Sequence, residues 1–171
     1  FALIKKIDTI NTKQIAEELD LFRDTTDSVM KSLRATIYDL SWRKNGANTF
    51  LEDIQNYICE IKRHCNIEIL FDIKGNHEIL TTALKKVIYR IICEGISNAV
   101  RHGMATQIKI NINIDKSKGV LFIKDNGSGF CMEDLMKKRN IGLGISNMQY
   151  IVDSVKGNIN IQSEIHQGTC I

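Results

Sequence analysis

The strict alternation of apolar and polar residues in two segments constrains the fold more than any other feature of the sequence. Every second residue from Ile108 to Ile114 is isoleucine, and the odd positions of residues 67–73 are likewise apolar. Successive side chains of a strand point to opposite faces of a sheet, so each strand buries one face and leaves the other solvated. Helices that cover only one face of a mixed sheet satisfy this pattern. The predicted fold class is therefore α/β, in the α+β sense of a two-layer sandwich.

The remaining segments supply the helices and the rest of the sheet. A capping box at Thr49 and Glu52 opens a helix that runs to about Cys65, and apolar spacing predicts a longer helix over residues 84–96. The further predicted elements are a return strand over residues 120–123, a short polar helix, a helix over residues 144–155 and a last hairpin from Ile159 to Ile171. A doubly wound parallel sheet would require continuous apolar strands, which the sequence lacks.

The N-terminal segment carries a narrower apolar stripe. Its apolar or small positions advance by alternating steps of four and three, which is the heptad pattern of a bundle helix. These positions are Ile15, Leu19, Phe22, Thr26, Val29, Leu33, Thr36 and Leu40. A capping box at Asn11 and Gln14 predicts a helix over residues 12–42, about 45 Å long, which needs a partner helix to bury the stripe. A helix that lies along the following domain is the alternative. We therefore place residues 1–44 in a bundle segment and residues 45–171 in a compact domain.

Composition excludes several classes of protein. The 171 residues are 43% hydrophobic and 25% charged, and the apolar runs are far shorter than the roughly 20 residues of a transmembrane helix. Twenty-three basic and 20 acidic residues leave a net charge of +3, which is too balanced to indicate a nucleic-acid surface. Five cysteines without a C-x-x-C pair indicate reduced thiols rather than a zinc site. The chain starts at Phe1 and stops inside a predicted strand, so we expect it to be a piece of a longer protein.

A row of polar residues lies on the predicted long helix. Glu94, Asn98 and His102 are spaced by four, which places them along one line of the helix surface. Carboxylate and amide oxygens are hard ligands suited to Mg²⁺, which usually completes its shell with water and phosphate oxygens. This spacing indicates a nucleotide site, although the polar edge of an amphipathic helix has the same pattern.

Two glycine-containing motifs follow. Asp125 stands at the end of a strand before Gly127 and Gly129, where its carboxylate could accept a hydrogen bond from an exocyclic amine. Asn-Gly and Ser-Gly are also ordinary turn sequences, so this motif alone leaves both interpretations open. Gly142 and Gly144 open a helix, whose first N–H groups and positive dipole end attract an anion. Neither a Walker A loop nor G-x-G-x-x-G is present.

Taken together, these motifs resemble those of a known family. The combination of E-x-x-x-N on a helix, D-x-G-x-G after a strand, G-x-G opening a helix and a final Gly-Thr pair resembles the Bergerat fold. This is the ATP-binding domain shared by gyrase, heat-shock chaperones, histidine kinases and MutL. The resemblance makes residues 94–102 the N box, residues 125–130 the first glycine box and residues 142–147 the second. It spans about residues 49–171.

Further likeness narrows the family. Residues 33–40 resemble the end of the second bundle helix in sensor histidine kinases of the nitrate-sensor and DesK-like subfamily, and a short lid over residues 132–140 fits that subfamily. Residues 137–139 of the lid are basic and could reach the phosphates, although a solvated helix end is the more ordinary explanation of such a run. The resemblance implies that residues 1–44 belong to the dimerisation and phosphoacceptor bundle, whose acceptor histidine would lie on a helix before Phe1. The chain's own histidines, none in a His-Asp acceptor motif, are His64, His77, His102 and His166.

The resemblance assigns roles residue by residue. It implies that Glu94 is the catalytic general base and an indirect contributor to the metal site, that Asn98 holds Mg²⁺ between the phosphates, and that Asp125 binds adenine. The full set of implied cofactor-binding residues is Asn98, Arg101, His102, Asp125, Gly127, Gly129, Gly142, Leu143, Gly144, Ile145 and Thr169.

The implied function is that of the catalytic, ATP-binding domain of a two-component sensor histidine kinase. Such an enzyme moves the γ-phosphoryl group of ATP to a histidine and then to a response regulator. ATP and Mg²⁺ are the expected cofactors. The expected partners are a DNA-binding response regulator and a second copy of the full-length protein, without direct contact to nucleic acid.

The expected location is the cytoplasm, with a membrane reached only through segments outside this chain.

Two alternatives to the kinase function stay open. One is a nucleotide-binding regulatory module or response-regulator phosphatase without kinase activity, and the other is an ATPase clamp of the gyrase or MutL kind.

Overall fold

The computed structural model describes residues 50–116, 118–131, 133 and 143–171, and residues 14–19, 21–22, 25–26, 29–30 and 33 of the N-terminal segment. The chain divides into two compact units, Phe1–Gly46 and Ala47–Ile171. The described residues of the first unit are helical, and large apolar side chains among them, such as Leu19 and Phe22, are exposed. The proposed role of this unit in a bundle stays a prediction. The capping residues expected at Asn11 and Thr49 lie outside the described residues.

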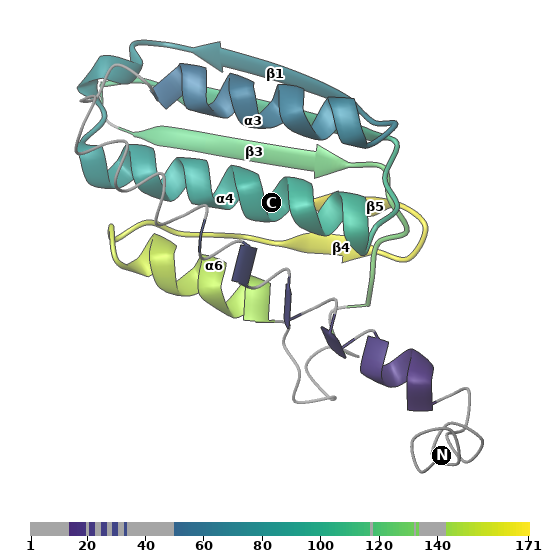
Figure 1. Ribbon diagram of the computed structural model, residues 1–171. Coiled ribbons are helices and arrows are strands. Elements are labelled where there is room, and N and C mark those ends of the chain that lie inside the picture. Colours follow the sequence, from purple (N-terminus) through teal and green to yellow (C-terminus); the bar gives the residue numbers. More distant parts are fainter. Residues whose placement is uncertain are drawn as a thin grey trace. The chain divides into compact units, whose positions relative to one another are not determined.

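The second unit is built on a five-stranded mixed sheet (Figure 1). Its strands are β1 (Glu68–Lys74), β2 (Gln107–Ile114), β3 (Gly119–Asp125), β4 (Gln162–Glu164) and β5 (Gly168–Cys170). Their order is β1-β2-β3-β5-β4, with β1 parallel to β2 and every other pair antiparallel. The predicted mixed sheet is therefore confirmed.

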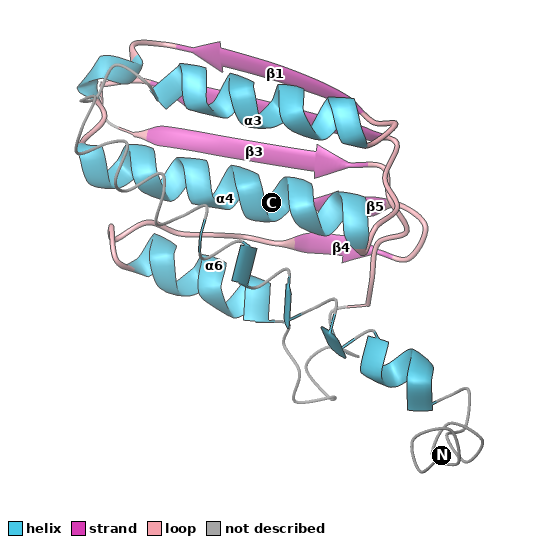
Figure 2. Ribbon diagram, in the orientation of Figure 1, coloured by secondary structure: helices cyan, strands magenta, loops and turns pink. Residues whose placement is uncertain are grey.

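The three longer described helices of this unit cover one face of the sheet, as the alternating strands predict (Figure 2). These helices are α3 (Phe50–His64), α4 (Thr82–Arg101) and α6 (Leu143–Asp153), and a 3₁₀ turn, η2 (His77–Ile79), precedes α4. Thr81 caps α4, because its side chain accepts a hydrogen bond from the Leu84 N–H. The parallel β1–α4–β2 connection places α4 over the centre of the sheet, between α3 and α6.

The core lies between the helices and the sheet. The isoleucines of β2 from Ile108 to Ile112 are at most 1% exposed, and Ile92 and Ile96 of α4 are fully buried. Side chains of the other sheet face, such as Lys109 of β2, are exposed. The two-layer sandwich is confirmed, and no helix among the described residues is long and apolar enough to cross a membrane.

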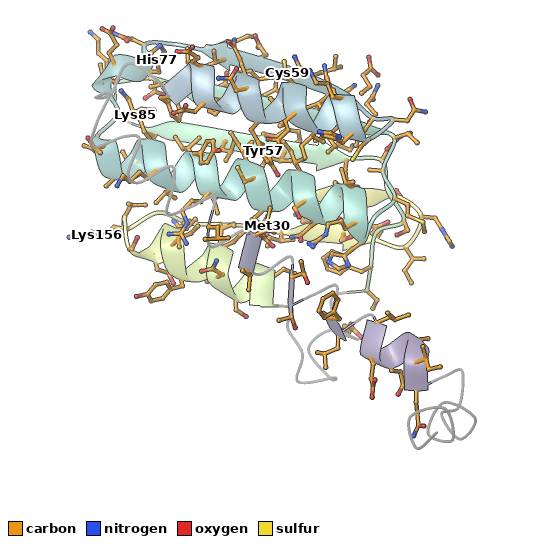
Figure 3. The ribbon with its side chains drawn as sticks, in the orientation of Figure 1. Met30, Tyr57, Cys59, His77, Lys85 and Lys156 are labelled. Carbon is orange, nitrogen blue, oxygen red and sulfur yellow. The ribbon has the colours of Figure 1, made fainter. Side chains whose placement is uncertain are left out.

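Helices α3 and α4 meet through a small aromatic cluster. The rings of Tyr57 and Tyr89 lie edge to face with centroids 6.4 Å apart, and the Tyr57 hydroxyl donates to the Cys93 carbonyl at 3.4 Å. Figure 3 shows Tyr57 between the two helices. Burial raises the pKa of Tyr89, and the neighbouring Cys93 adds to the shift through charge repulsion and a side-chain hydrogen bond. The Tyr89 phenol is therefore held in its neutral form.

The last hairpin is shorter than predicted. Strand β4 begins at Gln162, whereas the alternating residues Ile159 and Ile161 precede it without strand pairing. The reason is that β5 pairs only from Gly168 to Cys170, so the cross-strand register with β4 ends at Gln162. The predicted lid over residues 132–140 lies almost entirely outside the described residues, and so does the segment in which the short polar helix is expected.

Candidate functional site

Buried charged side chains lie at two positions along α4 and at the end of β3. Among the described residues, only Lys85, Glu94 and Asp125 are charged side chains less than 9% exposed. Charged groups are rarely buried unless a partner or a function holds them there. Two of the three are the carboxylates that the sequence motifs singled out.

Glu94 and Asn98 lie where α4 meets the start of α6. The two residues are one turn apart on α4, and the backbone of Gly144 passes directly beside them. A Cβ atom at residue 144 would overlap Glu94 Oε1 and would lie 3.6 Å from Asn98 Nδ2. The absence of a side chain at this position therefore lets the first turn of α6 approach the carboxylate. This contact joins the N box to the second glycine box.

Asp125 is held at the end of β3 by the loop that follows it. Its Oδ1 accepts a hydrogen bond of 2.7 Å from the Gly127 N–H. Gly127 in turn packs against the connection after α4, because a Cβ there would lie 2.6 Å from the Gly103 carbonyl oxygen. The neighbouring Ser128 N–H donates to that same oxygen at 2.7 Å. The first glycine box is thereby fixed to the C-terminal end of α4.

The same loop packs backbone to backbone against the hairpin of β4 and β5. Gly129 and Gly168 have φ angles of +59° and +81°, which side chains rarely adopt. A Cβ on Gly129 would overlap the Glu164 carbonyl oxygen, and one on Gly168 would overlap the Asp125 carbonyl oxygen. Both positions therefore require glycine. Asp125 and Thr169 consequently lie on adjoining strands next to this close approach.

Two further polar side chains, which the motif analysis did not single out, hold this region in place. Asn126 Oδ1 accepts from the N–H groups of Thr106 and Gln107, both at 2.9 Å, and so ties the loop to the start of β2. Ser163 Oγ accepts from the Phe130 N–H at 3.0 Å and lies 3.0 Å from the Thr169 hydroxyl. No sequence signal points to either role, because Asn126-Gly127 is an ordinary turn sequence and Ser163 belongs to no motif. Only the hydrogen bonds of the folded chain reveal them.

The structure brings the predicted residues together in two groups. Glu94, Asn98 and Gly144 form one, and Asp125, Gly127, Gly129 and Thr169 lie around the other. Ile145 is half-buried in the first turn of α6, Arg101 is half-buried at the end of α4, and His102, its C-cap, is exposed. Gly142 and the side chain of Leu143 lie outside the described residues, as do residues 137–139. The functional role of each of these residues stays a prediction.

The donor set suits a hard cation that is shared with phosphate. Asn98 and Glu94 offer amide and carboxylate oxygens from the same side of α4. Among the described residues, no three His, Cys, Asp or Glu side chains gather as a ready metal site. Mg²⁺ usually takes one or two protein ligands and completes its shell with water and phosphate. The residues present therefore fit that cation only in company with a nucleotide.

Comparison with known proteins identifies the class. The family described as Histidine kinase-, DNA gyrase B-, and HSP90-like ATPase matches residues 83–171, which include every described site residue above. The chain belongs to this family. The resemblance inferred from the motifs is thus confirmed, and the domain is an ATP-binding one.

Curated relatives narrow the class to one type of kinase. The chain is 28% identical over 162 residues to the signal transduction histidine-protein kinase/phosphatase DegS of Brevibacillus brevis, covering 93% of this chain and 41% of the relative. It is 34% identical over 92 residues to DegS of Bacillus subtilis (strain 168), covering 54% of this chain and 24% of the relative. The chain thus spans less than half the length of these relatives. It contains the ATP-binding catalytic domain of a sensor histidine kinase of the nitrate-sensor and DesK-like type.

Solved structures agree on the fold. The histidine kinase domain of the Erythrobacter litoralis EL346 blue-light activated histidine kinase superposes with a TM-score of 0.61 at 14% identity. The match covers 95% of this chain and 86% of that one. The likeness at this identity concerns the fold alone, and it confirms the predicted sandwich of helices on a mixed sheet.

Proposed function

We propose that this domain transfers the γ-phosphoryl group of ATP to a histidine of a dimerisation helix, from which it passes to an aspartate of a response regulator. The observation that carries the proposal is the contact of the buried Glu94 carboxylate with the first turn of α6, beside Asn98. A carboxylate held next to helix N–H groups that attract phosphate is well placed to act on a reaction at that phosphate.

The adenine end of the site is assigned to Asp125. This buried carboxylate can only accept hydrogen bonds when ionised, and an exocyclic amine can only donate them. Guanine presents a carbonyl oxygen at the corresponding position, which would leave the buried carboxylate unpaired. The Gly127 N–H bond to Oδ1 orients the group, because it fixes one oxygen of the carboxylate.

The phosphate end is assigned to the start of α6 and to Asn98. The first N–H groups of a helix have no partner within the helix and carry the positive end of its dipole, so they stabilise phosphate charge. The Asn98 amide oxygen would hold Mg²⁺ against the phosphates. When bound, this cation neutralises charge on the phosphate oxygens.

Glu94 is assigned the proton transfer. Its carboxylate would accept the proton of the acceptor imidazole N–H while that nitrogen forms the bond to the γ-phosphorus and ADP leaves with the electrons of the broken P–O bond. The residue is 8% exposed, so bulk water competes little for its oxygens. In a gyrase-type clamp the same carboxylate would activate water. The group that accepts the phosphoryl, a histidine or water, therefore distinguishes a kinase from such a clamp.

The proposed setting is that of a two-component kinase. The intact protein would act as a homodimer in the cytoplasm and would serve a DNA-binding response regulator. Removal of phosphate from that regulator is a second candidate activity, since the DegS relatives are named kinase/phosphatase.

The experiment compares Glu94→Gln and Asn98→Ala with the wild type in the intact protein. Glu94→Gln should keep the ATP dissociation constant within about twofold and slow formation of acid-labile phosphate by roughly 10²-fold, the scale of general-base catalysis. Asn98→Ala should instead remove the Mg²⁺ dependence of ATP binding. Transfer at the wild-type rate by Glu94→Gln would show that Glu94 is not the base.

A further inference from the structure

Three polar residues form a row across three strands on the helix-covered face of the sheet. Ser163 of β4 is the cross-strand partner of Thr169 of β5. The register that pairs Lys124 with Cys170 places Asp125 of β3 opposite Thr169 on the other side. Directly opposite residues in antiparallel strands have their side chains on the same face, about 5 Å apart.

The row faces α4 rather than solvent. Ile171 lies two residues after Thr169 and therefore points to the same face, and its side chain packs against Gly95 of α4. Asp125 is itself 8% exposed, while Ser163 and Thr169 are half-buried. The hydroxyls of Ser163 and Thr169 thus lie on the side of the sheet that carries the predicted nucleotide site.

Hydrogen-bond counting fixes the direction of the bond between the two hydroxyls. Ser163 Oγ has three partners at 3.0 Å, namely the Phe130 N–H, the Gly168 carbonyl oxygen and the Thr169 hydroxyl. A hydroxyl carries one proton and two acceptor lone pairs. The amide can only donate and the carbonyl can only accept, so the Ser163 proton goes to Gly168. The Thr169 hydroxyl must therefore donate to Ser163.

We propose that Ser163 is a positioning residue that orients the Thr169 hydroxyl, so that Thr169 and Asp125 present neighbouring acceptors to the exocyclic amine of the nucleotide base. With its proton directed to Ser163, Thr169 Oγ1 offers only lone pairs to a ligand. An exocyclic amine has two N–H donors, which two acceptors satisfy. A base with a carbonyl at that position finds no donor on either residue, so the pair discriminates between the two. This inference rests on the proposed assignment of Asp125 to the base.

The test is the ratio of ATP to inosine triphosphate affinity, measured by calorimetry on the 171-residue chain. Inosine differs from adenosine by a carbonyl in place of the exocyclic amine and by an N1–H in place of the N1 acceptor, so the ratio reports how this edge of the base is recognised. Ser163→Ala frees the Thr169 hydroxyl to rotate and donate, and should lower the ratio by at least about threefold, the effect of one hydrogen bond. Ser163→Thr keeps a hydroxyl and should restore the ratio. The control is Ser154→Ala, which removes a hydroxyl that donates to the Ile151 carbonyl oxygen at the end of α6. This variant should leave the ratio unchanged.

The outcomes separate the inference from the proposed function. Equal affinity of the wild type for both nucleotides would contradict the assignment of Asp125 to adenine, and the inference with it. A selective wild type with an equally selective Ser163→Ala would overturn the role of Ser163 alone. If circular dichroism shows that Ser163→Ala does not fold, the same ratio is measured for Thr169→Val. That variant lacks the acceptor and must lose at least as much of the ratio, and an unchanged ratio there would overturn the inference.

Discussion

At the scale of single residues, the site depends on places where a side chain is missing. Gly144 lets the backbone of α6 lie against the Glu94 carboxylate, and Gly168 lets β5 lie against Asp125. The Glu94 carboxylate occupies the space where a side chain at residue 144 would begin, and the Asp125 backbone carbonyl occupies the corresponding space at residue 168. Substitution at these positions should therefore act on the geometry of the site.

Gly144→Ala tests this idea at the catalytic end. The new Cβ would overlap Glu94 Oε1, so the carboxylate must shift. We expect phosphoryl transfer by the intact protein to slow by about 10²-fold, because a displacement of about 1 Å at a reacting group costs that much. The matched control is Gly119→Ala, where a Cβ would make an ordinary contact of 3.8 Å with Leu80. An unimpaired rate in Gly144→Ala would show that the contact does not position Glu94.

At the scale of elements, the packing of α3 against α4 is one of the contacts that hold the helix carrying Glu94. The Tyr89 phenol lies in this interface and hydrogen-bonds with the Cys93 side chain. Its pKa is raised by burial, so ionisation is more costly in the folded chain than in the unfolded one. The protein should lose stability as the pH rises above about 10, the pKa of an unfolded tyrosine.

Tyr89→Phe measures both contributions. At neutral pH the variant should be less stable by roughly 0.5–1.5 kcal/mol, the net value of one hydrogen bond. Above about pH 10 its stability should fall less steeply than that of the wild type, because phenylalanine cannot ionise. Urea denaturation across this pH range measures both effects. Tyr150→Phe, at a side chain that is 75% exposed, is the control and should match the wild type throughout. Identical pH dependence of the Tyr89→Phe variant and the wild type would contradict the account.

Most elements could be predicted from their sequence patterns. The alternating isoleucines, which begin at Ile108, locate β2 to within one residue of its observed start at Gln107, and apolar spacing locates α3, α4 and α6 to within a few positions. The start of β4 could not be predicted, because it depends on which residues of β5 lie opposite. The 3₁₀ turn η2 has no apolar period to reveal it, and Asn76 caps it through a local hydrogen bond.

The site was predictable as a set of motifs but not as an arrangement. Glu94 and Gly144 were both singled out, yet their contact joins helices far apart in the sequence. Ser163 carries no motif, because its place follows from pairing with Thr169 and from the Phe130 N–H that reaches it. Long-range proximity of this kind is a property of the folded sheet, which local patterns do not contain.

At the scale of the whole molecule, the 171-residue chain should bind ATP without phosphorylating itself. None of its four histidines lies in an acceptor motif. Incubation with γ-labelled ATP and Mg²⁺ should therefore yield no acid-labile phosphate, whereas the intact protein should be labelled. These histidines are His64, His77, His102 and His166. Phosphohistidine at any of them would overturn the assignment of the acceptor to a separate dimerisation helix.

The central claim is that this domain binds ATP through the buried carboxylate of Asp125, and calorimetric titration of the chain with ATP and with GTP tests it most directly. We expect ATP to bind much more tightly than GTP. We also expect Asp125→Asn to weaken ATP binding by about 1–3 kcal/mol, because the charge-assisted hydrogen bond to the amine is lost, while the fold persists. Equal affinities for ATP and GTP, or an Asp125→Asn variant that binds ATP as the wild type does, would contradict the account.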